Sequence, residues 1–322
     1  MSSSANTESF PMSDTPVERT VSLTATQPFA WSVRREIWEH RAVWMAPLIA
    51  AGLVLFGFVI RIFDLPHAWL ELGKLPPGMQ TAAIAAPFAI AAGSILVTGL
   101  VVSVFYCLGA LNNERRDRSI LFWKSLPVSD TTTVLAKLFI PMVAIPAVLF
   151  VAVTVTQLIM LLLATGTLAA NGIGAGIVWT QWPILRMTVV LLYLLLVTTL
   201  WYAPVYGWLL MVSSWARRIP FLWAVLPWPG LAILEKIAFG SEYVGRFINY
   251  VFNGWVNEAL KMPAGFEGHR GHVHVKDIPV IDPLALLNPV HFFTTPAVWI
   301  GLVVTAAFVA AAIYFRRKRD PG

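Results

Sequence analysis

The sequence predicts an all-α integral membrane protein with six transmembrane helices, an N-terminal amphipathic helix at the membrane surface and a short cytoplasmic helix. Hydrophobic residues make up 57% of the 322 residues, charged residues make up 12%, and the mean hydropathy is +0.71. A soluble domain usually carries about a quarter charged residues. The apolar residues also gather in long runs, and Lys and Arg flank these runs. Much of the protein surface must therefore face lipid rather than water.

Six apolar runs are long enough to be spans, because a helix needs about 20 apolar residues to cross the hydrocarbon core. The second, third and fourth runs contain no charged residue. The fifth is weaker, since it contains Pro227 and Pro229 and the charged pair Glu235 and Lys236. This pair either reaches the outer surface or takes part in gating a substrate. The predicted spans are residues 44–62, 82–106, 138–164, 187–212, 220–239 and 296–315.

The distribution of Lys and Arg predicts the orientation, since cytoplasmic connections carry an excess of both. Fifteen of these residues lie on one side of the predicted spans and eight on the other. The richer side holds the segment before the first span, two of the connections between spans, and the end of the chain. We therefore expect a multi-pass protein of the bacterial inner (plasma) membrane with both termini in the cytoplasm.

The chain divides into one membrane domain and two tails. Residues 1–27 are rich in Ser and Thr and lack an apolar core, which is typical of a disordered cytoplasmic tail rather than a secretory signal peptide. The first span then acts as its own insertion signal. Residues 28–315 form the six-span domain, and residues 316–322 form a basic cytoplasmic tail. The single cysteine, Cys107, excludes an intrachain disulfide and a cysteine-rich metal site.

Two further segments are amphipathic rather than spanning. In residues 28–43 the apolar side chains of Phe29, Val33 and Ile37 recur every four positions, as on one face of a helix. Several tryptophans nearby fit the headgroup level of the inner membrane surface. Residues 242–260 carry a similar apolar stripe in the outer loop after the fifth span. The basic clusters indicate anionic membrane lipids as partners, and the chain contains no nucleic-acid-binding module.

The loop of residues 113–138 is the most informative stretch. A cytoplasmic helix here would be held close to the bilayer, so a force that a partner applies to it would pass into the second and third spans. The alternative is a solvated loop whose basic residues only set the orientation. The segment contains, in order, a charged start, the apolar run 120–123, a turn at Leu126 and Pro127, a helix cap at Ser129 or Asp130, and Lys137.

This loop resembles the first cytoplasmic loop of the permease subunits of type-2 ATP-binding-cassette (ABC) exporters. Their pattern is Glu-Arg, a small residue plus Leu, a turn with Leu-Pro-Val-Ser, and a lysine before the next span. The chain departs from it at Phe122 and Trp123, where the family often carries an acidic residue. Six spans, the amphipathic entry helix and the basic end of the chain also fit the family. The matching residues are Glu114, Arg115, Ser119, Leu121, Leu126, Pro127, Val128, Ser129 and Lys137.

The resemblance implies a transmembrane half-transporter whose loop docks a separate ATPase subunit. Two permease subunits, identical or paralogous, would form the path. ATP and Mg would bind to the partner, and the chain itself would hold no cofactor and no catalytic residue. Consistent with this, the sequence contains no G-x-x-x-x-G-K-[ST] phosphate-binding loop. The residues implied in docking are Glu114, Arg115, Ser119, Leu121, Leu126, Pro127 and Lys137.

A different function class remains open from the residues alone. His269, His272 and His274 lie in a Gly-containing outer loop at spacings that can bind zinc or copper, with Glu267 or Asp277 needed to complete a site. They would suit a membrane-embedded metal-responsive sensor or enzyme, although a solvated, hairpin-like loop is the simpler explanation. A structural membrane scaffold without transport is a third possibility. The aromatic cluster around Trp201 in the fourth span either lines a path for an amphipathic substrate or packs against other helices.

Overall fold

The computed structural model describes residues 26–72, 75–116, 129–174, 176–216, 218–261 and 283–318. Within these ranges the chain is helical, and the β structure is limited to one isolated antiparallel bridge between Leu260 and Leu287. The predicted all-α class is therefore confirmed. The tail predicted over residues 1–27 lies almost entirely outside the described residues.

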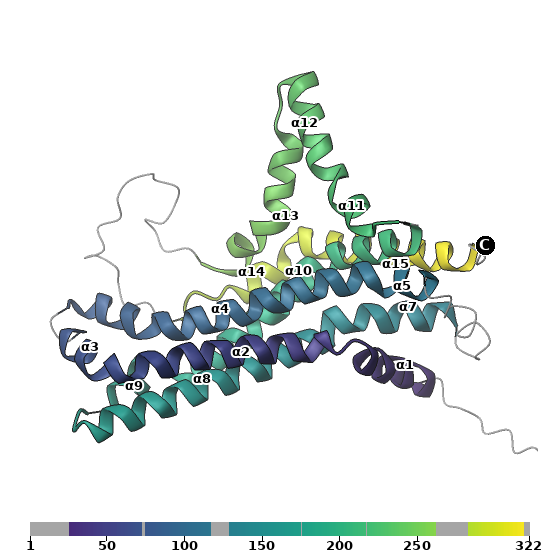
Figure 1. Cartoon of the computed structure of the whole chain (residues 1–322). Helices are drawn as coiled ribbons and strands as arrows, with labels where there is room; N and C mark the ends of the chain where they lie inside the picture. Colours follow the sequence, from purple (N-terminus) through teal and green to yellow (C-terminus); the bar gives the residue numbers. More distant parts are fainter. Residues whose placement is uncertain are drawn as a thin grey trace, which may run out of the picture.

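A bundle of long helices forms the main body of the protein (Figure 1). Its interior is filled by aliphatic side chains that recur every three or four positions along each helix, as expected for helices that bury one face. The bundle helices are α2 (Ala42–Arg61), α4 (Pro77–Ala110), α8 (Ile145–Ala170), α10 (Ile184–Trp215) and α15 (Pro296–Lys318).

Six helical segments among the described residues are long and apolar enough to cross a membrane, which is the number that the sequence predicts. The second, third and fourth extend well beyond the predicted apolar runs, because polar residues continue the helix at one or both ends. The segments are Ala42–Asp64, Met79–Arg116, Asp130–Ala170, Val178–Trp215, Pro220–Phe239 and Pro296–Lys318.

The third span is one continuous helical segment built from three parts. It begins with α7 (Asp130–Phe139), passes through a π-helical turn, η2 (Ile140–Ala144), and continues as α8. Ser129 caps its start, since its hydroxyl accepts a hydrogen bond from the Thr132 amide at 3.1 Å. Pro141 lies inside the π turn, where its missing amide relaxes the regular hydrogen-bond pattern.

Small residues allow α10 and α15 to pack closely. A side-chain carbon added at Gly207 of α10 would lie 3.4 Å from the Cα of Thr305, and one at Gly301 of α15 would lie 3.1 Å from the Pro204 ring. Close backbone approach through small residues is the usual way for membrane helices to gain van der Waals contact without a hydrophobic driving force. This contact holds the last helix against the centre of the bundle.

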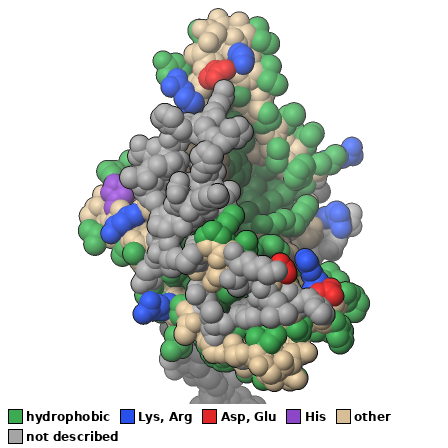
Figure 2. Space-filling view, turned by 90° about the vertical axis from the view of Figure 1, so that its left-hand side faces the viewer, with side chains coloured by type: hydrophobic (Ala, Val, Ile, Leu, Met, Phe, Trp, Pro, Cys, Tyr) green, Lys and Arg blue, Asp and Glu red, His purple; other side chains and the backbone are tan. Residues whose placement is uncertain are grey.

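An arm of residues 220–259 projects away from the bundle (Figure 1). The fifth candidate span forms its outgoing half, and no residue of α12 is buried. Figure 2 shows charged side chains at its tip and hydrophobic side chains along its flank. The arm consists of α11 (Pro220–Val225), α12 (Pro227–Phe239) and α13 (Tyr243–Ala259).

The charged pair of the fifth span holds the tip of the arm together. The Glu235 carboxylate accepts hydrogen bonds from the backbone amides of Tyr243 and Val244, both at 2.7 Å, and so caps the start of α13. Lys236 lies 2.9 Å from a carboxylate oxygen of Glu242. Both charges therefore have a local role in closing the turn between α12 and α13.

The aromatic cluster of the fourth span anchors the base of the arm. The indole of Trp201 donates to the Val251 carbonyl at 2.9 Å, and the Tyr202 hydroxyl donates to the Phe252 carbonyl at 2.8 Å. These side chains pack on α13 and satisfy its backbone, which favours the packing interpretation over a substrate path.

Shorter helices complete the described structure. The amphipathic helix predicted over residues 28–43 is α1 (Thr26–Glu39), and α2 follows it after a short connection. The remaining short elements are η1 (Ile62–Asp64), α3 (Leu65–Leu72), α5 (Asn112–Arg116), α9 (Gly176–Gln181) and α14 (Pro289–Thr294).

Candidate functional site

One end of the bundle gathers four elements that are far apart in the sequence. These are α1, α5, the start of α7 and the end of α15 (Figure 1). The apolar stripe of α1 packs on α7, and the rings of Phe29 and Phe139 meet edge to face at 5.7 Å. Glu36 is seven positions after Phe29 and therefore lies on the same face of the helix. Packing of this stripe carries the Glu36 carboxylate into the protein.

Glu36 meets a lysine from the third span. The Lys137 ammonium lies 2.8 Å from a Glu36 carboxylate oxygen and 3.0 Å from a carboxylate oxygen of Glu114 in α5. Lys137 is 0% exposed and Glu36 is 1% exposed. One buried cation thus bridges the amphipathic helix and the helix that leaves the second span.

The chain of ion pairs continues to the last helix. Nη1 of Arg316 lies 2.8 Å from the second carboxylate oxygen of Glu114, and Nε of the same guanidinium lies 2.8 Å from Asp130. Asp130 is the first residue of α7. The guanidinium fork of Arg316 therefore ties α15 to both elements that flank residues 117–128, because its donors point in two fixed directions.

Two further side chains surround the Glu36 carboxylate. Arg35 lies 2.8 Å from one of its oxygens and 3.4 Å from Glu114. The Tyr106 hydroxyl, from the second span, donates to the other oxygen at 2.9 Å. The Glu36 carboxylate is therefore contacted by side chains from three places: its own helix α1, the second span and the third span.

Six described groups, three cations and three carboxylates, make the shorter ion pairs of this ion-pair network. Burial alone raises the pKa of the Glu36 carboxyl, but Lys137 and Arg35 beside it outweigh burial and lower the pKa to about 2. The carboxylate consequently stays ionised at neutral pH. Pairing and hydrogen bonding of these groups avoid the large cost of an isolated buried charge. The members of the ion-pair network are Arg35, Glu36, Glu114, Asp130, Lys137 and Arg316.

A second set of hydrogen bonds ties the same region to the end of α10. The Arg115 guanidinium donates to the backbone carbonyls of Ser213 and Ala216, the latter at 3.0 Å. The Ser213 hydroxyl accepts hydrogen bonds from the amides of Leu111 and Asn112, both at 3.1 Å. The kink between α4 and α5 is therefore fixed against the fourth span.

The structure describes three of the residues implied in docking. Glu114 and Lys137 meet in the ion-pair network, and Arg115 contacts the end of α10 instead. Because Glu114 and Lys137 are buried, their side chains contact the protein itself. The rest of the set, Ser119, Leu121, Leu126 and Pro127, lies outside the described residues.

Sequence reasoning missed Glu36 and Arg316. A signal for Glu36 existed, because a carboxylate at i+7 from Phe29 lies on the apolar face of the helix, where an unpaired charge would be costly. Arg316 had a weaker signal, since it is one of several consecutive basic residues that a positive-inside pattern explains equally well.

The arrangement is suited to hold helices together. Its charged groups pair with one another, and they come from α1, α5, α7 and α15. Among the described residues, no group of three or more His, Cys, Asp and Glu side chains is placed to hold a metal ion. His269, His272 and His274 lie outside the described ranges.

Comparisons of the chain with protein-family models, with curated proteins and with solved structures found no match.

Proposed function

We propose that the chain is the permease subunit of an ABC transporter, working in export, and that residues 113–138 dock its ATPase. The proposal is supported most directly by the ion-pair network. Glu114 precedes the central part of this loop and Lys137 follows it, and these two side chains lie 3.0 Å apart. Both ends of the proposed docking segment are therefore anchored at one buried point.

This anchoring suits a loop that transmits force. A displacement of the loop would move α5 and α7 together, because buried ion pairs resist separation of their partners. The same pairs would carry the displacement into α1 through Glu36 and into α15 through Arg316. A loop that only sets orientation would have no need of such bracing, and so the network favours the docking interpretation.

The partners follow from this proposal. A separate ATPase subunit binds ATP and Mg, and this chain supplies no catalytic residue. A second permease subunit, identical or paralogous, completes the path. The basic residues that end α15 share one end of the bundle with the network, which supports a cytoplasmic location for both termini in the bacterial inner membrane.

Capture of the tagged chain from its native membranes in a mild detergent tests the proposal. The wild-type chain should recover an ATPase subunit that contains a phosphate-binding loop, and the captured complex should hydrolyse ATP. Leu121→Ser and Leu126→Ser should each lower the recovered ATPase at least about tenfold.

The matched control is Leu185→Ser. Leu185 is 81% exposed and lies at the start of α10, whereas the end of α10 is the part that contacts Arg115 near the loop. The Leu185→Ser variant should recover as much ATPase as the wild type. Recovery of no ATPase by the wild-type chain, or equal recovery by the loop variants, would show that the loop has no docking role.

A further inference from the structure

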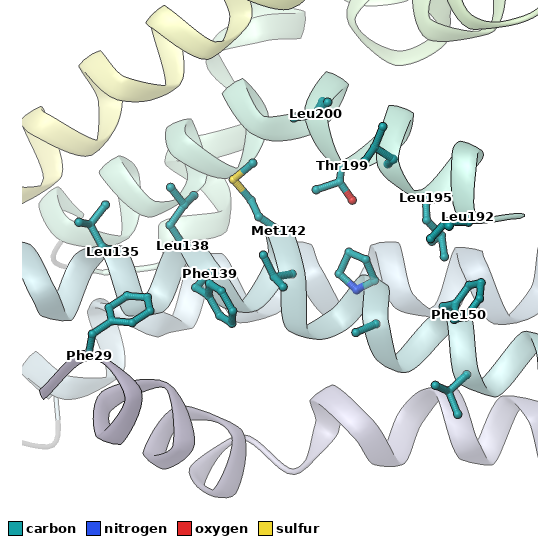
Figure 3. A pocket seen from close by; sticks show the side chains of 15 residues that line it. Phe29, Leu135, Leu138, Phe139, Met142, Phe150, Leu192, Leu195, Thr199 and Leu200 are labelled. Carbon is teal, nitrogen blue, oxygen red and sulfur yellow. The ribbon is translucent and has the colours of Figure 1, made fainter. Parts of the chain in front are cut away.

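An apolar groove runs along the outside of the bundle between the third and fourth spans. Its volume is about 790 Å³, and it lies between the segment α7–η2–α8 on one side and α10 on the other. Figure 3 shows Phe29 of α1 at one end of the groove and Phe150 and Leu192 at the other. The groove therefore begins at the amphipathic helix and follows the spans into the bilayer.

The lining of this groove is suited to a hydrocarbon chain. Thr199 is its single hydroxyl-bearing residue, and the other lining side chains are aliphatic, aromatic, methionine or proline. A groove of this composition offers contact to methylene groups and almost no hydrogen bonds. Such a surface inside a bilayer favours an extended acyl chain over a polar solute.

A second hollow adjoins the groove at its α1 end. It has a volume of about 370 Å³ and shares Phe29 and Phe139 with the groove, so the two hollows meet at this pair of rings. Its charged residue is Arg34. Arg34 is exposed, and no carboxylate among the described residues pairs with it.

Arg34 also lies at the level where lipid headgroups belong. Its guanidinium is 5.6 Å from the ring of Trp31 and 5.1 Å from that of Trp38, and both indoles are at least 65% exposed. Exposed tryptophans on an amphipathic helix occupy the membrane–water interface. An apolar groove thus ends at the interface beside a cation that has no counter-ion among the described residues.

We propose that this place binds one anionic phospholipid, with an acyl chain in the groove and its phosphate on Arg34. The charge of Arg34 selects an anionic over a zwitterionic headgroup, because a basic side chain at a membrane surface attracts anionic lipid. The same lipid would contact α1, α7 and α10 and so brace α1 against the spans. The inference does not depend on the ATPase partner.

Native mass spectrometry of the delipidated full-length chain in detergent tests the site. Phosphatidylglycerol and phosphatidylcholine with identical acyl chains are titrated separately. The wild type should bind one phosphatidylglycerol per chain in preference to phosphatidylcholine. Arg34→Gln should weaken phosphatidylglycerol binding about fivefold, the effect of about one basic residue near a membrane surface. It should weaken phosphatidylcholine binding less, because the choline group offsets the charge of that phosphate.

A second variant tests the groove itself. Ala147 lines the groove and is exposed, so Ala147→Trp should fill it and weaken both lipids at least about tenfold. The controls are Ala306→Trp on an exposed face of α15 and Arg317→Gln, neither of which lines the hollows. Both should bind lipid within twofold of the wild type.

Three results would overturn the proposal. One is equal binding of the two lipids by the wild type with no effect of Arg34→Gln. Another is competition by glycerol phosphate alone, which would indicate a site for free phosphate. The third is a dimer that Ala147→Trp converts to monomer with unchanged lipid binding, which would place a second copy of the chain in the groove.

Discussion

The ammonium group of Lys137 lies 2.8 Å from a carboxylate oxygen of Glu36, although 101 positions separate the two residues in the sequence. Both side chains are almost completely buried. A contact of this kind fixes the amphipathic helix α1 on the third span. It also makes the stability of this end of the bundle dependent on a small number of charges, each of which can be removed separately.

Lys137→Met should destabilise the protein strongly. The substitution leaves Glu36 and Glu114 buried without their shared cation, and breaking a buried pair in this way costs about 3–5 kcal/mol. The double variant Glu36→Gln, Lys137→Met should cost less than the sum of the single variants, since it removes both charges of the pair. Unfolding by SDS in mixed micelles, followed by tryptophan fluorescence, gives the free energies.

Lys318→Met, at an exposed lysine near the same end, is the control and should change stability by less than about 0.5 kcal/mol. Strict additivity of the two single variants would contradict a direct contact.

Acid should weaken the contact in a defined pH range. The folded-state pKa of Glu36 is about 2, below its ordinary value of 4.5, so the folded protein binds a proton at Glu36 less readily than the unfolded chain does. The resulting stabilisation is complete above about pH 4.5 and is lost as the pH falls toward 2. A shift of this size corresponds to about 3 kcal/mol. The difference in stability between the wild type and Glu36→Gln should therefore shrink as the pH falls through this range. Glu39→Gln, at an exposed carboxylate on the same helix, should leave the wild-type pH dependence unchanged. If Glu39→Gln reduced the pH dependence of stability as much as Glu36→Gln does, the effect would not belong to Glu36.

Arg316 should not be replaceable by lysine. Its Nε and Nη1 atoms contact Asp130 and Glu114 separately, and an ammonium group cannot reproduce this fork. Arg316→Lys should lower the free energy of unfolding by about 1–3 kcal/mol, and Arg316→Ala by about 3–5 kcal/mol, the value for a broken buried pair. The neighbouring Arg317→Ala should have little effect, because Arg317 is exposed and makes a 3.4 Å hydrogen bond to Thr131. If Arg316→Ala and Arg317→Ala lowered the free energy of unfolding equally, the ion pairs of Arg316 could not be the cause of the loss.

Gly254 should tolerate no larger residue at the base of the arm. A side-chain carbon there would lie 2.7 Å from the Trp201 ring and 2.9 Å from the Tyr250 ring. Gly254→Val should displace α13 from α10, break the hydrogen bond from Trp201 to the Val251 carbonyl, and cost about 1–3 kcal/mol. Gly245→Val on the same helix has open space around it and serves as the control. Limited proteolysis of the arm provides the measurement, with faster cleavage expected only in the Gly254 variant. An identical cleavage rate in both variants would contradict the close packing.

The sequence was sufficient to predict the apolar helices, but not to predict which helices and side chains contact one another. Long uncharged runs such as residues 138–164 identify a membrane helix by composition alone, because the bilayer sets the required length. The arm could not be foreseen, since the apolar run of residues 220–239 has the same composition whether it packs in the bundle or projects from it. Glu114 and Lys137 were singled out through a family pattern, whereas their buried contact depends on how α5 and α7 meet in space. Helical periodicity could mark Glu36 as a buried charge on the apolar face of α1, but it could not identify Lys137 as its partner.

The distance along the chain between Glu114 and Arg316 has a consequence for biosynthesis. These residues are 202 positions apart, so the ribosome must add all of the intervening chain before the pair can form. At about 5–20 residues per second this delay is roughly 10–40 seconds. During that interval Lys137 and Arg35 can already pair with Glu114, whereas its second carboxylate oxygen still lacks the guanidinium of Arg316. Arrival of α15 then closes the network, which makes its completion a chemical mark that α1, α5, α7 and α15 have come together.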